Sequence, residues 1–289
     1  MTIKAYENSD CGLLYWQQPA AIESEVNILM KQSARSLGAF FCAIAVMLCF
    51  ASVAFASGVE PYEGNVIAQE QCGDDATAYL TDTDGDNMAD SLFVSGTGAT
   101  FDYATSGEHV YNQTAWYTSA SSIRRIVIND GITSLGTRLF MNPSGGCVYT
   151  CQDGVDVSIA DSVKKIGQSV FLRFSTARFG NLPNQLVEIG PQAFQGTGIG
   201  SGNDGVVTIP ESVSTVGRKA FESCTSLTTL HIMGTLNQVS GTPAASVFAG
   251  CTNLTSVSVA GGIGINMMFA AYDATTQACV NLKSVTFTG

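Results

Sequence analysis

The feature that most constrains this chain is a repeat in its second half. Aliphatic residues form a short pattern, L-x-x-L-x-L in its clearest copies, seven times. The last two apolar residues of the pattern alternate with small polar residues, as in a strand with one buried face. The patterns end at Ile128, Ile159, Leu182, Ile209, Ile232, Val259 and Phe287, so successive ends are 31, 23, 27, 23, 27 and 28 residues apart. Such a period predicts stacked copies of one unit, because a single unit cannot bury its own apolar face.

Two further features recur at the same intervals as these strands. The first is an apolar pair followed by glycine, as in Val213, Val216 and Gly217, where the glycine indicates a tight corner or a positive φ. The second is a phenylalanine on a short segment expected to form one helical turn with an inward face. The phenylalanines are Phe140, Phe171, Phe194, Phe221 and Phe248.

The repeat length lies in the range of leucine-rich repeats, ~20–29 residues, with insertions in the longer copies. We therefore expect an α/β repeat fold: a leucine-rich-repeat solenoid with a parallel β-sheet on the concave face. Short helical turns or loops should lie on the convex side, and a small β cap should cover the N-terminal end. The Gly-rich insertion at residues 196–205 should be a flexible surface loop between two coils.

The repeat resembles that of the BspA-like leucine-rich-repeat surface proteins, which reads roughly I-P-x-S-V-x-x-I-G-x-x-A-F-x-x-C-x-x-L-x-x-V. Residues 209–230 match this pattern almost position by position, and residues 159–171 match its first half. Residues 92–103, LFVSGTGATFDY, resemble the segment that often precedes the first repeat of that family. The resemblance covers about residues 75–289. It implies a solenoid that is secreted or exposed at the cell surface, and it leaves the ligand unspecified.

The N-terminal region indicates export. Residues 37–56 are almost free of polar side chains, Lys31 and Arg35 precede them, and Ala54-Phe55-Ala56 forms a small-x-small cleavage site. This layout is typical of a secretory signal peptide, and an uncleaved membrane anchor is the alternative. After cleavage no membrane span would remain.

These patterns divide the chain into four segments. The expected segments are residues 1–29, a mis-assigned start or unusual leader; residues 30–56, the signal peptide; residues 57–120, a lead and β cap; and residues 121–289, the solenoid.

The charge balance excludes two classes of partner. The chain has 13 basic and 24 acidic residues, which gives a formal net charge of −11. Binding to nucleic acid or to anionic lipid needs a concentrated Lys/Arg surface, which this composition does not supply. We therefore expect an acidic product that is secreted or held at the cell surface, and the cleavage site and the family resemblance favour a bacterial source.

Outward-facing positions of the expected strands form two columns on the concave face. Most are small, hydroxylated or β-branched, which is typical of any exposed strand but also suits a weakly polar surface that binds protein or glycan. The candidate binding residues are Arg125, Asp156, Phe179, Asn181, Thr208, Thr229, His231, Ser256 and Ser258.

An acidic segment in the expected cap resembles the start of a calcium-binding loop. Asp82, Asp84, Asp86 and Asp90 place carboxylates at short intervals, and a hard cation takes 6–8 oxygen ligands. The bidentate Glu of an EF-hand is absent, because Phe93 stands at that position. The alternative is an Asp-rich hairpin turn without metal. No other cofactor is expected.

The cysteines fall into two groups. Cys147 and Cys151 lie in an inserted loop and are a candidate disulfide in an oxidising exterior. Cys224, Cys251 and Cys279 occupy the same place in three copies of the repeat, where we expect reduced, buried residues that pack as small hydrophobes.

The sequence favours a binding protein over an enzyme. It contains no G-x-S-x-G, H-E-x-x-H or P-loop motif, and only two histidines. The main hypothesis is adhesion to a protein or glycan through the concave sheet. The alternative is a spacer module of a larger envelope protein that has no ligand of its own.

Overall fold

The computed structural model describes residues 62–141, 154–238, 246–264, 268–269 and 278–288. The chain divides into two compact units, Met1–Val59 and Glu60–Gly289, and all described residues belong to the second unit. The expected leader and signal peptide, together with Cys147 and Cys151, lie outside the described residues and stay predictions.

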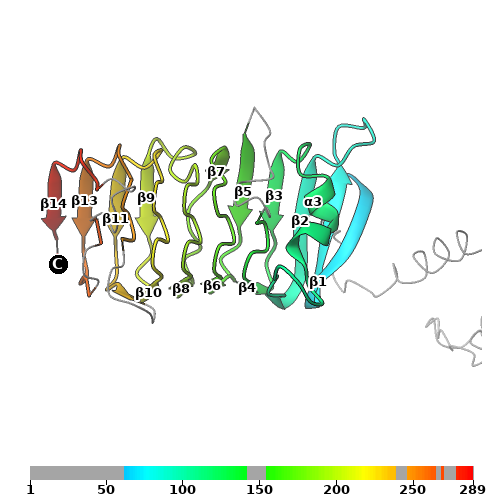
Figure 1. Ribbon diagram of the computed structural model, residues 1–289, viewed down its shortest axis with the longest axis horizontal. Helices are drawn as coiled ribbons and strands as arrows, with labels where there is room; N and C mark the ends of the chain where they lie inside the picture. Colours follow the sequence, from blue (N-terminus) through cyan, green and yellow to red (C-terminus); the bar gives the residue numbers. More distant parts are fainter. Residues whose placement is uncertain (1–61, 142–153, 239–245, 265–267, 270–277, 289) are drawn as a thin grey trace, which may run out of the picture. The chain divides into compact units, whose positions relative to one another are not determined.

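Parallel strands from successive coils lie side by side and form one wall of a stack (Figure 1). We call this the front wall; it is the sheet expected on the concave face. Its strands are β3 (Arg125–Ile128), β5 (Val155–Ile159), β7 (Ala177–Phe179), β9 (Val206–Ile209), β11 (Thr229–Ile232), β13 (Ser256–Val259) and β14 (Ser284–Phe287). The leucine-rich-repeat solenoid predicted from the period is confirmed.

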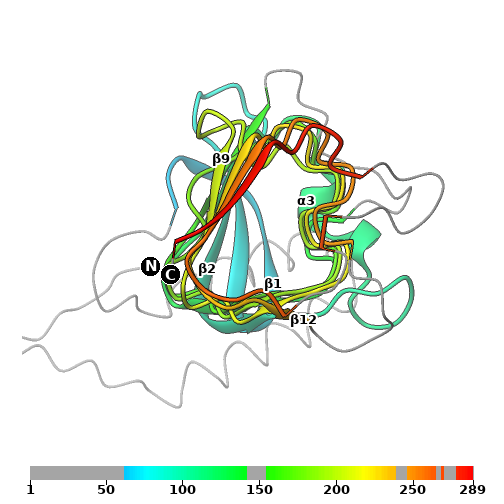
Figure 2. The same cartoon turned by 90° about the vertical axis from the view of Figure 1, so that its left-hand side faces the viewer.

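A second parallel sheet, which the sequence did not predict, runs along the stack at an angle to the front wall (Figure 2). Its strands other than the last contain apolar residues of the pairs that precede the recurring glycines, and we call this sheet the second wall. Its strands are β4 (Ile132–Leu135), β6 (Lys165–Ile166), β8 (Glu188–Ile189), β10 (Thr215–Val216) and β12 (Asn237–Gln238). Viewed along the stack, the coils nearly superpose.

The recurring glycine lies where successive coils approach most closely. A Cβ added to Gly190 would lie 2.7 Å from the carbonyl carbon of Gly167, and one added to Gly217 would overlap the backbone nitrogen of Pro191. Neither Gly190 nor Gly217 has a positive φ. Of the two expected roles, the structure therefore supports the tight corner, and the requirement is steric.

The phenylalanine segments are turns and not helical turns. Residues two before and two after the phenylalanine have positive φ: Gln192 (57°) and Gly196 (67°) flank Phe194, and Lys219 (59°) and Ser223 (61°) flank Phe221. A backbone that enters the left-handed region twice in five residues cannot continue as an α-helix. The expected helical turns are thus corrected to a pair of left-handed corners, which turn the phenylalanine ring inward.

The phenylalanine rings form one continuous stack inside the coils. Their centroids are 5.5, 5.4, 5.2, 5.1 and 5.6 Å apart along the series Phe140, Phe171, Phe194, Phe221, Phe248 and Phe269. Phe171, Phe194, Phe221 and Phe248 are fully buried among the aliphatic residues of both walls. The shared interior predicted for the repeats is confirmed, and Phe269 extends it by one ring that the sequence did not predict.

The N-terminal cap merges with the stack. Strand β2 (Ser91–Thr100) pairs antiparallel with β1 (Asn65–Asp82), and it also pairs in parallel with both β3 and β4. The parallel stack therefore begins within β2, earlier than the expected boundary at residue 121. A 3-10 helix, η2 (Tyr111–Gln113), and a short helix, α3 (Ala115–Thr118), are the helices of the described residues, and both belong to this end.

The Gly-rich insertion is not simply the surface loop expected from its composition. Thr197, Gly198, Ile199 and Gly200 are buried, and the amide of Gly198 donates to the carbonyl of Phe174 at 3.0 Å. Strands β7 and β9 belong to different sheets. The insertion thus contributes to the core at the point where the hydrogen bonding of the front wall is interrupted.

Candidate functional site

The front wall brings most of the predicted binding residues into two outward columns. On one side of the interruption Arg125 pairs with Asp156. On the other side Thr229 pairs with Ser256, and Thr208, His231 and Ser258 pair in sequence across β9, β11 and β13. The predicted strand positions of these residues are confirmed, whereas their role in binding stays a prediction.

Phe179 does not belong to this surface. It pairs with Val157, is only 2% exposed, and packs edge-on against Phe171 and Phe194. The register pairs Asp156 with Arg178 instead. The prediction that Phe179 faces outward assumed regular alternation back from Leu182. One extra residue follows β7 before Leu182 returns to the interior, and a slip by one residue exchanges the two faces of a strand.

Asn181 also departs from its predicted place. It follows β7 and is not a strand residue, but it is exposed and lies 3.3 Å from the side-chain nitrogen of Asn203. Asn181 and Thr208 both line a hollow of about 710 Å³ at the ends of the front-wall strands. The structure therefore brings these two predicted residues together, although not as neighbours in one column.

Two ion pairs mark the part of the front wall nearest the cap. The guanidinium of Arg178 contacts the carboxylate of Asp156 through two nitrogens, at 2.7 and 3.0 Å. Hydrogen bonding by Arg178, against a smaller desolvation cost, holds the pKa of Asp156 below its ordinary value, and the charges of Arg178 and Arg125 act in the same direction. The second pair joins Arg125 to Glu63 at 2.7 Å.

Three of these residues, Arg125, Asp156 and Arg178, line a shallow hollow of about 460 Å³, which we call the charged hollow. It spans three strands of the front wall and reaches the Gly-rich insertion. Its lining consists of Arg125, Asp156, Val157, Ser158, Arg178, Phe179, Gly180 and Gly202.

Sequence reasoning missed Arg178 and Glu63. The alternation of Ala177, Arg178 and Phe179, apolar then charged then apolar, would have identified Arg178 as outward-facing.

The remainder of the front wall carries hydroxyl groups. Nδ1 of His231 and Oγ of Ser258 are 2.6 Å apart, and Oγ of Ser284 donates to Oγ of Ser256 at 3.3 Å. Hydroxyl and imidazole groups both donate and accept hydrogen bonds. This part of the wall can therefore contact polar ligands of either character.

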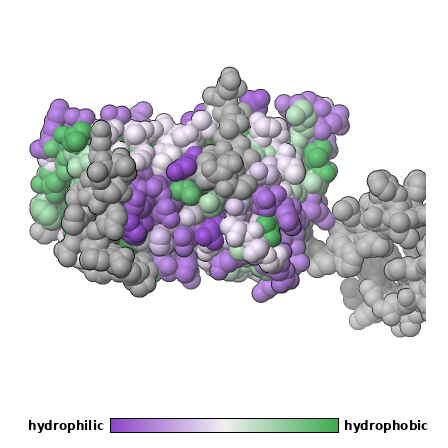
Figure 3. All heavy atoms as spheres, viewed as in Figure 1, coloured by the Kyte–Doolittle hydropathy of each residue, from purple (hydrophilic) through white to green (hydrophobic). Residues whose placement is uncertain are grey.

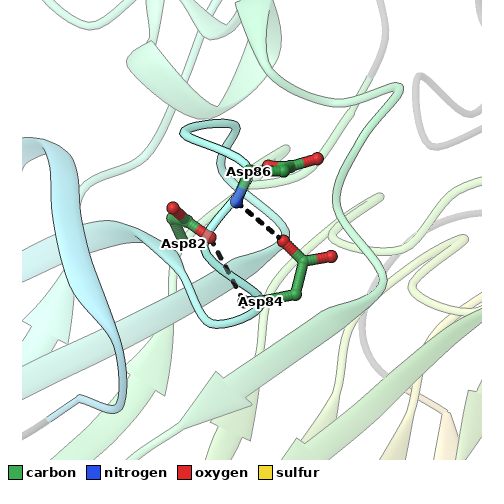
Figure 4. Close-up of side chains that lie close together, drawn as sticks. All are labelled: Asp82, Asp84 and Asp86. Carbon is green, nitrogen blue, oxygen red and sulfur yellow. Dashed lines mark hydrogen bonds between the residues drawn. The ribbon is translucent and has the colours of Figure 1, made fainter.

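Three of the four predicted calcium ligands lie together in the loop between β1 and β2 (Figure 4). The carboxylate oxygens of Asp82, Asp84 and Asp86 lie within 4.8 Å of one another. Both oxygens of Asp82 accept backbone amides, from Gly85 at 2.6 Å and from Asn87 at 2.9 Å. These hydrogen bonds, led by that of Gly85, lower the pKa of Asp82.

Asp90 lies outside this group. Its carboxylate accepts hydrogen bonds from the amide and the hydroxyl of Thr83 at 2.9 and 2.8 Å and from Ser91 at 2.6 Å. Although partial burial favours the neutral form, the hydrogen bonds from Ser91 and Thr83 keep the pKa of Asp90 low. Asp90 thus closes the loop instead of joining the other carboxylates, and calcium binding by Asp82, Asp84 and Asp86 stays a prediction.

The three repeat cysteines are buried as expected. Each thiol donates to the carbonyl of a phenylalanine one coil earlier: Cys224 to Phe194 at 3.0 Å, Cys251 to Phe221 at 3.1 Å and Cys279 to Phe248 at 2.9 Å. All three are free thiols in the structure. Contacts with the neighbouring thiols, together with burial, raise the pKa of Cys251. These residues satisfy the carbonyls of the turns and belong to the core.

Comparison with known proteins identifies the repeat. The model of the BspA type leucine-rich repeat region matches residues 144–266 and 205–288, with six copies. No curated protein matches the chain.

Solved structures give weaker likenesses. A leucine-rich repeat protein from Eubacterium ventriosum is 18% identical, with 76% of this chain and 84% of that chain covered and a TM-score of 0.34. A leucine-rich repeat protein from T. pallidum is 19% identical over 63% and 81% of the two chains, with a TM-score of 0.38. A leucine-rich cell surface protein from Faecalibacterium prausnitzii is 15% identical over 75% and 94%, with a TM-score of 0.21.

Proposed function

Because the chain belongs to the BspA-type leucine-rich-repeat family, we propose that it is a non-catalytic bacterial protein, secreted or exposed at the cell surface, that binds a protein or a glycan through its front wall. The observation that carries this proposal is the row of outward side chains along the front wall. Asp156, Ser158 and Thr208 are exposed there, and Thr229, His231, Ser256 and Ser258 are partly exposed. Extended solenoid faces of this kind commonly serve as binding surfaces.

The apolar segment at residues 37–56, with its basic flank and small-residue cleavage site, supports export. Within the described residues, no helix combines the length and the apolarity needed to cross a bilayer.

The chemistry of the charged hollow supports binding without turnover. Among the described residues of its lining Asp156 is the one carboxylate, and it is held by two hydrogen bonds from Arg178. This contact lowers the pKa of Asp156. A general acid or base works best with a pKa near the operating pH, so Asp156 is better suited to accept hydrogen bonds from a ligand than to transfer protons.

Glycan arrays and pull-down against matrix proteins test the proposal when the exported chain is compared with two variants of a single coil. Thr208→Arg changes an exposed residue of the front wall, and Ser214→Arg changes an exposed residue next to β10 of the second wall. Both variants add the same charge. We expect Thr208→Arg to weaken binding and Ser214→Arg to leave it unchanged. Equal loss in both variants, or loss only in Ser214→Arg, would contradict the assignment of the face.

A second function, that of a spacer module, is favoured by the end of the stack at β14. Hydrophobic residues gather on the surface there (Figure 3), and Val280, Val285 and Phe287 are exposed, with Phe287 at 68%. An exposed group of hydrophobic residues is typical of a surface that contacts another protein or module. Absence of any ligand in both assays, with an intact fold, would favour the spacer function.

A further inference from the structure

Resting on the proposed function, we propose that the charged hollow binds the carboxylate of an acidic glycan, one that contains hexuronate residues. Arg125 is the side chain that binds the ligand carboxylate, and Glu63 forms an ion pair with Arg125 when no ligand is bound.

Arg125 is positioned to receive a carboxylate. Its side chain is 48% exposed, and its guanidinium carbon lies 5.6 Å from the centre of the Phe93 ring. Stacking on an aromatic ring holds the planar guanidinium in one orientation. One of its terminal nitrogens contacts Glu63. The planar guanidinium carries further N–H donors, in a geometry that matches a carboxylate in bidentate contact.

Glu63 is a displaceable partner. Its side chain is 68% exposed, and an ion pair this open to water contributes little free energy. A ligand carboxylate that contacts Arg125 and also fills the hollow can therefore replace Glu63 at small cost. The Asp156–Arg178 pair is almost as exposed, at 64% and 41%, but two hydrogen bonds hold it in place of one.

The lining also suits a sugar ring. The carboxylate of Asp156 and the hydroxyl of Ser158 lie in the same lining as Arg125, and both can accept hydrogen bonds from ligand hydroxyls. Gly180 leaves room, because a Cβ added there would meet no atom within 4 Å. The volume of about 460 Å³ lies in the range of small-ligand sites.

A protein ligand fits the hollow less well. Protein interfaces are anchored by large aromatic and aliphatic side chains in buried contacts. The exposed large hydrophobic residues of the described part of the chain, such as Val187, Met233 and Phe287, all lie outside the lining of the hollow. The lining combines three charged side chains and one hydroxyl with apolar surface, and it holds none of these exposed hydrophobic residues. This combination favours an acidic glycan over an acidic peptide.

Calorimetric titration of the exported chain with the trimer of galacturonate tests the inference. The methyl ester of the trimer keeps its size and removes its charges, and a triglutamate peptide supplies carboxylates without sugar rings. About 0.15 M salt screens the long-range repulsion by the protein's net negative charge. We expect the trimer to bind, and the methyl ester and the peptide to bind at least about tenfold more weakly.

Two variants change the affinity in opposite directions. Arg125→Gln should weaken binding of the trimer at least about tenfold, whereas Glu63→Gln should tighten it about two- to fivefold, because the competing carboxylate is removed. Matched controls are Arg173→Gln, which removes an exposed charge from a turn, and Glu188→Gln, which breaks an ion pair with Lys165 in the second wall. Both controls should bind as the wild type does.

Several outcomes would overturn the inference: no binding of the trimer, equal binding of the ester or the peptide, or no tightening in Glu63→Gln. If Thr208→Arg still weakens binding of another array ligand, the front wall remains a binding face. Only the inference that the charged hollow binds a glycan carboxylate is then wrong. If no front-wall variant affects any ligand, the proposed function falls as well.

Discussion

At the scale of single residues, backbone crowding between coils decides which side chains are tolerated. Gly217 has no room for a Cβ, because the backbone of Pro191 lies against it, whereas a Cβ on Gly180 would point into open space. Neither glycine has a positive φ. The difference between them is therefore one of packing alone.

Gly217→Ala should destabilise the protein by about 1–3 kcal/mol, because overpacking forces the neighbouring backbone to shift. Gly180→Ala should change the stability by less than about 0.5 kcal/mol. Chemical denaturation of both variants checks this prediction. Equal effects of the two substitutions would show that coil spacing does not depend on Gly217.

The buried thiol of Cys72 makes stability depend on alkaline pH. Burial, with a contribution from the charge of Glu70, raises the pKa of Cys72 to about 12 from an ordinary value of 9.0. Between these values the unfolded chain loses a proton that the folded protein keeps. The free energy of unfolding should therefore fall by up to about 1.4 kcal/mol per pH unit from pH 9 to about 12.

Urea unfolding at several pH values tests this dependence in the wild type and in Cys72→Ala. The variant should show a shallower decline, although some slope remains because burial also raises the pKa of Tyr103. Below pH 9 the two proteins should respond to pH in the same way. Identical slopes above pH 9 would contradict the prediction.

At the scale of elements, the ring stack and the two walls support each other. Phe194 lies in the middle of the stack, with Phe171 and Phe221 on either side and Phe179 packed against its edge. Phe269, at the end, contacts Phe248 and is only partly buried. In a solenoid each coil is stabilised by its neighbours, so an interior coil depends on two interfaces.

Phe194→Ala should therefore destabilise the protein by about 3–5 kcal/mol, the usual cost of removing a buried phenylalanine. Phe269→Ala should cost clearly less, because among the described residues its ring stacks on Phe248 alone and is partly exposed. Thermal unfolding of both variants gives the comparison. A larger loss in Phe269→Ala would contradict the order of the stack.

The loop between β1 and β2 carries the calcium prediction. If calcium binds Asp82, Asp84 and Asp86, saturating calcium should stabilise the wild type against thermal unfolding relative to EDTA, by about 2.7 kcal/mol at a hundredfold excess over the dissociation constant. Asp84→Asn should abolish the shift, while its amide oxygen can still accept the Asp86 amide. In Asp90→Asn the shift should persist. If calcium does not stabilise the wild type, the calcium prediction is wrong and the loop is an ordinary hairpin turn.

The sequence predicted those elements whose burial pattern alternates regularly. It placed Thr229 and Ser256 on the outward face of neighbouring strands, as the structure does. It failed at β7, where an extra residue before Leu182 shifts the alternation. The second wall was missed because its strands are mostly two residues long.

The turns were mispredicted for a different reason. The left-handed positions around the phenylalanines are occupied by glycine at Gly196 and Gly250, but by serine, lysine, arginine or glutamine elsewhere. Residues with a Cβ seldom adopt this conformation, so their identity gives no signal of it. The ion pair of Arg125 with Glu63 was not predictable either, because Glu63 lies 62 residues before Arg125.

At the scale of the whole molecule, the stack separates what stabilises the fold from what can bind. Phenylalanines, aliphatic residues and thiols fill the interior, and glycines set the spacing of the coils. The front wall adds two columns of side chains that this core does not use, charged near β3, β5 and β7 and hydroxylated near β9, β11 and β13. The central claim is that ligands bind on this wall.

A crystal structure of the exported chain, grown with the tightest ligand from the glycan array, tests this claim most directly. We predict ligand density over the front wall, within hydrogen-bonding distance of side chains from at least two of its strands. Density confined to the second wall, to the turns that carry the phenylalanines, or to the exposed end at β14 would contradict the claim.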